Sequence, residues 1–165
     1  MKRLVFLMFV MVMVVLVMVV SAMPQAANAQ QAAPADLKVV NDCLKNADKS
    51  DKLGTGCIGL VADPCRAKSD NDTAKNRACA QRELVVWNAI SDAAGKRVRA
   101  GGFKEIAKAL ADSEKAWAQQ RDALCPVFDK IEPGFLPGDA NYCRMQTTAN
   151  RALLLRKLGD AVNEH

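Results

Sequence analysis

The sequence predicts an all-α fold, a small bundle of about four to five helices held together by disulfides. Beyond an apolar N-terminal stretch, the chain is rich in Ala and charged residues and poor in aromatic ones, which favours helices over sheets. Apolar residues recur at spacings of three and four in several segments, and no segment alternates with period two for long enough to form a convincing strand. Six cysteines supply the cross-links.

The N-terminal segment has the parts of a secretory signal peptide. Two basic residues precede a run from Leu4 to Val20 that contains no charged or polar side chain, and small residues follow it. We expect cleavage after Ala29, with Ala22 as the alternative. No cysteine follows the apolar run until Cys43, which argues against a lipoprotein-type cleavage and a lipid anchor.

Cleavage after Ala29 would remove 29 of the 165 residues and leave 136. We expect a signal peptide over 1–29, a linker over 30–35 and a helical domain over 36–165. The whole chain carries a formal charge of +5, and loss of Lys2 and Arg3 lowers it to +3. This mild excess gives no support to nucleic acid as a partner. The mature chain shows no membrane span, and we expect it to be periplasmic or secreted.

The first two helices are short. Helical spacing of Leu37, Val40 and Leu44 predicts a helix over about 34–47. A shorter one is predicted over about 56–62, stopping before Pro64 because proline disfavours a helical conformation in the residue before it.

The third helix is predicted over about 74–98, after a polar loop in which Asp72 or Thr73 can serve as its N-terminal cap. Cys79, Glu83, Trp87 and Ile90 follow at spacings of three and four, so they form one stripe. Gly101-Gly102 ends this helix.

Two further helices complete the prediction. One covers about 103–125, ends at or is kinked by Pro126, and is expected to turn five apolar residues inward: Ile106, Leu110, Trp117, Leu124 and Phe128. A Pro- and Gly-rich loop over 131–140 follows. The last helix covers about 141–162, with Met145, Leu158 and three consecutive leucines from Leu153 to Leu155.

The six cysteines behind a signal peptide predict three disulfides in an oxidising compartment. Fifteen pairings are possible. A disulfide requires Cα atoms about 5.5 Å apart, whereas 14 residues of continuous helix would separate them by about 21 Å. Each bridge must therefore flank a chain reversal, and each interval between sequence neighbours contains turn residues. The spacing favours three pairs: Cys43–Cys57, Cys65–Cys79 and Cys125–Cys143.

No catalytic or metal-binding constellation is visible. His165 is the single histidine and stands last in the chain, so Ser-His-Asp chemistry and histidine metal sites lack their key residue. Asp70 and Asp72 resemble the start of a calcium loop, but Gln81 stands where a bidentate Glu is needed. We therefore expect no enzyme activity, metal or cofactor.

A charged residue interrupts the apolar stripe of each long central helix. Glu83 lies between Cys79 and Trp87, and Arg121 lies between Trp117 and Cys125. Because an unpaired buried charge is costly, we expect a buried Glu83–Arg121 ion pair, whose loss in Arg121→Ala would cost about 3–5 kcal/mol. Glu83 with Asp122 is the alternative, a carboxylate pair. Both tryptophans are expected in the core.

Two blocks of sequence resemble a known family. The first contains Cys57-Ile58-Gly59, Cys65 and Cys79-Ala80-Gln81-Arg82-Glu83-x-x-x-Trp87. The second is Trp117-x-x-x-Arg121-Asp122-x-x-Cys125, followed by Cys143-x-x-x-Thr147-x-x-x-Arg151-x-x-x-Leu155. Over about 57–155 they resemble the lysozyme inhibitor LprI-like N-terminal domain family of small exported bacterial proteins. The chain departs from the family pattern at Asn88, over 91–95, at Glu114 and at Gln120.

This resemblance implies a non-catalytic protein that inhibits a lysozyme. The alternative is an envelope structural or interaction protein that inhibits nothing. If it does inhibit, two disulfide-bounded loops are candidates for insertion into the enzyme's cleft. One, over 68–76, carries Asp70 and Asp72; the other, over 131–142, carries Phe135 and Asp139 and is favoured because an aromatic residue on a stiff loop is a good anchor.

Overall fold

The computed structural model describes residues 31–50, 53–131 and 139–164, and they form helices with no β-strand among them. Residues 31–165 make up one compact unit. The predicted all-α, disulfide-linked fold is confirmed. The expected signal peptide, residues 1–29, lies outside the described residues. No helix of the described part has both the length and the apolar character needed to cross a bilayer.

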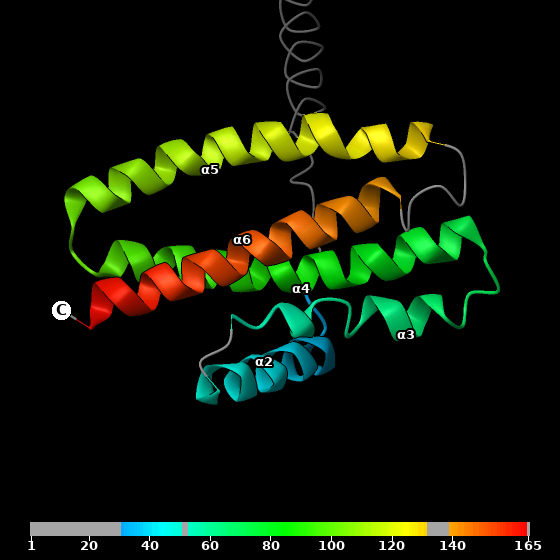
Figure 1. Cartoon of the computed structure of the whole chain (residues 1–165), viewed down its shortest axis with the longest axis horizontal. Helices are drawn as coiled ribbons and strands as arrows, with labels where there is room; N and C mark the ends of the chain where they lie inside the picture. Colours follow the sequence, from blue (N-terminus) through cyan, green and yellow to red (C-terminus); the bar gives the residue numbers. More distant parts are fainter. Residues whose placement is uncertain (1–30, 51–52, 132–138, 165) are drawn as a thin grey trace, which may run out of the picture. The chain divides into compact units, whose positions relative to one another are not determined.

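Two long helices, α4 (Thr73–Ala100) and α6 (Ala140–Asn163), form the centre of the bundle. They make the most extensive helix–helix contact and run in the same direction (Figure 1). Trp87 on α4 and Met145 and Leu153 on α6 are fully buried in the main core cluster. The predicted stripe of α4 is therefore the face that packs inward.

The N-terminal elements cover one side of this pair: α2 (Pro34–Lys49), the short 3-10 helix η1 (Thr55–Cys57) and α3 (Ala62–Arg66) (Figure 1). Val40 and Leu44 insert from α2 into the core. Two ion pairs also hold α2: Arg82 of α4 binds both carboxylate oxygens of Asp36 at 2.6 Å, and Arg156 of α6 reaches Asp48 at 2.6 Å.

The helix predicted over 56–62 is wrong. The chain instead makes a 3-10 turn at η1 and then α3, which contains Pro64. Proline is compatible with the first turn of a helix, because an N–H there has no acceptor within the helix. Helix α2 begins at Pro34, where the helix over about 34–47 was predicted to begin, so its first two residues fall inside the linker expected over 30–35, and Ala32 already packs against the core.

Helix α5 (Lys104–Leu124) and the 3-10 helix η2 (Cys125–Lys130) lie on the other side of the central pair, and α5 runs opposite to it (Figure 1). Leu110 is the one residue of α5 that is buried, in a small second cluster with Ala94, Val98 and Leu155. The inward face predicted for this helix is wrong in its C-terminal half, because Leu124 is 48% exposed.

Three disulfides cross-link the described elements: Cys43–Cys57, Cys65–Cys79 and Cys125–Cys143. They are the pairs that the cysteine spacing favours. The first ties α2 to η1, the second ties α3 to α4, and the third ties the junction of α5 and η2 to α6. Each disulfide thus spans a chain reversal.

Candidate functional site

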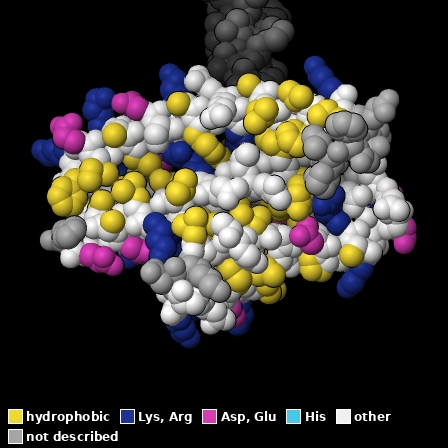
Figure 2. All heavy atoms as spheres, viewed as in Figure 1, with side chains coloured by type: hydrophobic (Ala, Val, Ile, Leu, Met, Phe, Trp, Pro, Cys, Tyr) yellow, Lys and Arg dark blue, Asp and Glu magenta, His cyan; other side chains and the backbone are white. Residues whose placement is uncertain are grey.

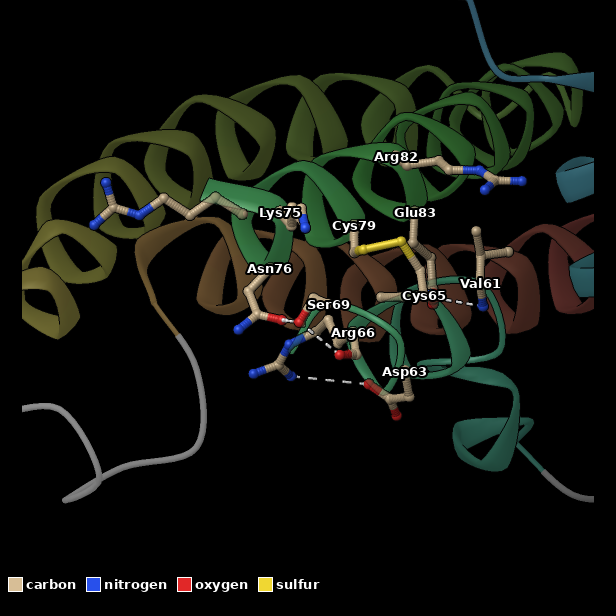
Figure 3. Close-up of a disulfide and its surroundings, with 12 residues drawn as sticks. Val61, Asp63, Cys65, Arg66, Ser69, Lys75, Asn76, Cys79, Arg82 and Glu83 are labelled. Carbon is tan, nitrogen blue, oxygen red and sulfur yellow. Dashed lines mark hydrogen bonds and ion pairs between the residues drawn. A yellow bond between two sulfur atoms is a disulfide. The ribbon is translucent and has the colours of Figure 1, made fainter. Parts of the chain in front are cut away.

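Glu83 is a buried carboxylate that four N–H donors surround. Its side chain on α4 has no exposed surface. Oε1 accepts hydrogen bonds from the backbone N–H of Gly59 at 2.7 Å and from the Trp87 indole at 2.8 Å. Oε2 accepts from the N–H group of Val61 at 2.8 Å (Figure 3) and from that of Ala62 at 2.6 Å.

The predicted Glu83–Arg121 ion pair is therefore wrong. The donors are mostly main-chain groups at the start of α3, which have no acceptor within their own helix. Glu83 acts as the N-terminal cap of α3 from a neighbouring helix, and its charge is stabilised by backbone dipoles rather than by a cation. Its role is to join α3 to α4, next to the Cys65–Cys79 disulfide (Figure 3).

The turn between α3 and α4 is built from polar residues. Asp70 and Asn71 have positive φ angles of 53° and 62°, the left-handed conformation that Asp and Asn tolerate best after glycine. The Ser69 hydroxyl lies 2.7 Å from the carbonyl oxygen of Arg66 and 2.6 Å from Oδ1 of Asn76 (Figure 3). Asp72 caps α4 by accepting from the N–H of Lys75 at 2.9 Å. Asp70 and Asp72 are both exposed.

The second candidate loop adjoins the same end of the bundle. Arg77, in the first turns of α4, binds Asp129 of η2 at 3.0 Å and lies 3.8 Å from Asp139. Asp139 caps α6 by accepting from the N–H groups of Asn141 and Tyr142. Residues 132–138, including Phe135, lie outside the described residues.

A groove lies between α5 and α6, and its lining contains several residues of the second sequence block. The Trp117 ring on α5 lies against two guanidinium groups: that of Arg121, 4.6 Å from the ring centroid, and that of Arg151 on α6, at 4.9 Å. These distances are typical of cation–π contacts. The groove has a volume of about 310 Å³, and its other lining residues are Gln120, Leu124, Thr147, Asn150, Leu154 and Leu155.

The groove is basic and apolar at once. Figure 2 shows hydrophobic side chains gathered where α5 and α6 lie, with basic side chains among them. Arg121 donates to its neighbour Asp122 at 2.8 Å, a hydrogen bond that lowers the pKa of the Asp122 carboxyl. Arg151 donates to the Ser113 hydroxyl at 3.2 Å, and burial lowers the pKa of its guanidinium.

The structure thus separates the predicted motif residues into two groups. Glu83 and Trp87 lie in the core, whereas Trp117, Arg121 and Arg151 come together at the surface, and Asp122 is exposed beside them. The prediction of Trp117 as a core residue is wrong, since its ring is only half-buried. Among the described residues, no group of three or more His, Cys, Asp or Glu side chains is placed to hold a metal ion.

Sequence reasoning missed the groove itself. One signal was present: Leu153, Leu154 and Leu155 are consecutive, and consecutive residues on a helix do not share a face. Leu153 and Leu155 are buried, and Leu154 is 63% exposed on the groove. An exposed leucine one turn from Arg151 marks the same surface.

The three disulfides, the capped turns at one end and the basic apolar groove on one side belong to a small, disulfide-stabilised helical protein. The chain belongs to the lysozyme inhibitor LprI family, whose model matches residues 65–155, just over half of the sequence. The match includes Glu83 and the groove residues Trp117, Arg121 and Arg151, but not α2. The comparison with curated proteins gave no match, and neither did the comparison with solved structures.

Proposed function

We propose that this protein is exported, by cleavage near Ala29, to the periplasm or the exterior, and that it inhibits a lysozyme by occupying its substrate cleft. Membership of the LprI family supports lysozyme as the target, because the family is described as one of lysozyme inhibitors. Three disulfides support an oxidising compartment. Inhibition by occupation requires no reacting group from this chain.

One observation carries the mechanism: the two disulfide-bounded loops adjoin the same end of the bundle. Arg77 contacts both Asp129 before the second loop and Asp139 at its close, and it lies on the turn of α4 that follows the first loop. A turn held by a disulfide and by caps loses little conformational entropy on binding. This end of the molecule is therefore the best-prepared element for insertion into a cleft.

Of the two loops, that over 131–142 remains our preferred inserting element. In the sequence Phe135 stands between Pro133 and Pro137, and an aromatic anchor contributes more to an interface than an exposed acidic turn. The turn with Asp70 and Asp72 would then contact a basic cleft rim. Since the mature protein would carry +3, no long-range attraction to a basic lysozyme is expected, and the recognition must be short-range.

The test is titration of the purified, disulfide-bonded protein against lysozyme acting on cell-wall substrate. Phe135→Ala is expected to weaken inhibition without changing the thermal midpoint. For the other loop, Asp70→Asn combined with Asp72→Asn removes both charges, and Asn caps a helix about as well as Asp. Asp112→Asn, on the exposed face of α5, is the matched control.

Each outcome has a distinct meaning. Inhibition that survives both the Phe135→Ala variant and the paired Asp→Asn variant would reject insertion of these loops. Absence of inhibition by the unmodified protein would reject the proposed function. An envelope interaction role, without any effect on lysozyme, would then stand in its place.

A further inference from the structure

Arg151 is a half-buried cation whose charge is only partly offset by the described residues. It makes one hydrogen bond, to the neutral Ser113 hydroxyl, and no ion pair with a described carboxylate. The nearby acids have closer partners: Glu114, whose charge also acts on Arg151, pairs with Arg99 at 3.2 Å, and Asp122 pairs with Arg121. A partly desolvated guanidinium with spare donors gains from any carboxylate brought to it.

The surroundings of Arg151 also offer an apolar contact. Leu154 and Leu124, both in the groove lining, expose 63% and 48% of their surface. Trp117 has at least part of its ring covered by the guanidinium groups of Arg121 and Arg151, so the ring orders these two cations within the groove. An ordered cation beside exposed leucines fits a ligand that has a carboxylate next to an apolar group.

We propose that the groove between α5 and α6 is a second binding site, which takes an acidic segment of a partner protein. A carboxylate of that segment pairs with Arg151, and an adjacent apolar side chain packs on Leu154. The N-terminal 30 residues of this chain contain no Asp or Glu, so they cannot supply the carboxylate. This groove is distinct from the end of the bundle whose two loops are proposed to enter a lysozyme cleft, and its test involves no lysozyme.

The experiment uses ¹⁵N-labelled, disulfide-bonded protein and a terminally blocked tetrapeptide in which Asp alternates with Leu. The peptide is expected to shift the Trp117 indole and Arg151 side-chain resonances, while the buried Trp87 indole stays unchanged. The matched peptide with Asn in place of Asp should bind about 10-fold more weakly or worse, because hydrogen bonds to charged groups are the stronger ones.

Two groove variants locate the site. Arg151→Gln should weaken binding of the acidic peptide about 10-fold or more. Leu154→Ser changes an exposed residue and should weaken it several-fold with the fold intact. Arg156→Gln is the matched control on the same helix, since it removes a cation that Asp48 already pairs; its binding should equal that of the unmodified protein.

If Arg151→Gln fails to fold, Arg151→Lys is used in its place. This variant keeps the positive charge but loses the planar guanidinium, so its affinity for the acidic peptide should be lower than that of the unmodified protein but still measurable. The proposal is overturned by equal affinity for the acidic and neutral peptides, by Leu154→Ser binding that matches the unmodified protein, or by no shift at about 10 mM peptide. Concentration-dependent dimers that Leu154→Ser abolishes would also overturn it, since the occupant would then be a second copy of the chain.

Discussion

At the scale of single residues, Glu83 accounts for more of the local structure than any other polar group described. Its carboxylate satisfies three backbone N–H groups and one indole N–H, in a place without exposed surface. Gly59, one of the donors, has a φ of +97°, and a Cβ there would lie 2.2 Å from Oδ2 of Asp63. The segment can present its N–H groups to Glu83 in this way because glycine stands at that position.

Replacement of Glu83 by Ala should therefore lower the free energy of unfolding by at least about 3 kcal/mol, because several buried donors lose their acceptor. Asp92→Ala is the matched control. It lies on the same helix, is exposed, and should change the free energy by less than about 0.5 kcal/mol. Urea denaturation measures both, and similar values for the two variants would contradict the capping role.

Tyr142 gives a second prediction, because it is the single tyrosine of the chain. Burial raises the pKa of its phenol, and the nearby charge of Asp63, whose Oδ1 accepts from the hydroxyl at 3.3 Å, raises it further. The native state thus favours the neutral phenol. The resulting stabilisation is complete below the unfolded pKa of about 10 and is lost as pH rises through the native pKa.

Tyrosinate absorbance should show a higher titration midpoint in the native protein than in the urea-unfolded chain. Asp63→Asn should move the native midpoint down, but not to the unfolded value, because burial is the larger cause. Coincident native and unfolded midpoints would show that the ring is not protected in solution.

The sequence revealed that Glu83 needed a partner but not which partner. A charged residue on an apolar stripe indicates that some other group stabilises its buried charge. The spacing of residue types in a sequence can suggest only side chains as that group. Three of the four donors are main-chain groups more than 20 residues earlier, on a segment whose short helix was itself predicted at the wrong place. Backbone N–H groups carry no residue-type signal, so composition and spacing do not identify them.

At the scale of elements, the bounds of the long helices could be predicted from the sequence more accurately than the face that each helix buries. The bounds of α4, α5 and α6 lie within two residues of the predicted ones, because caps, glycines and Pro126 mark their ends. The burial of α5 was not predictable in the same way. Helix α5 packs chiefly through Leu110 and through its disulfide-linked end. Trp117 is therefore half-buried and Leu124 largely exposed, although their spacing is that of one helix face.

Helix α2 is the element whose attachment is easiest to test. Its core contribution is Val40 and Leu44, supplemented by the Cys43–Cys57 disulfide and two ion pairs. Replacing both cysteines by Ala should lower the free energy of unfolding by about 3 kcal/mol, the value expected for a closed loop of this length. Hydrogen exchange should then show α2 losing protection before α4 and α6. Simultaneous loss in all three helices would indicate that α2 is an inseparable part of the core.

At the scale of the whole molecule, the exported product can be checked by mass. We expect a chain beginning at Gln30, six mass units lighter than its fully reduced form because three disulfides are closed. Alkylation should add no label until a reductant is present. A product that retains residues 4–20, or one that alkylates without reduction, would contradict the assignment of a signal peptide or of a fully oxidised chain.

The arrangement of the disulfides has a consequence for survival among proteases. The Cys125–Cys143 bridge joins the two sides of the 126–142 segment, and the Cys65–Cys79 bridge does the same for the turn before α4. A single peptide-bond cut between η2 and α6, or in the turn between α3 and α4, leaves two pieces that are still one covalent molecule. Helices α4, α5 and α6 would remain uncut, and the groove between α5 and α6 would keep both of its walls. A nicked molecule would migrate as intact protein until its disulfides are reduced.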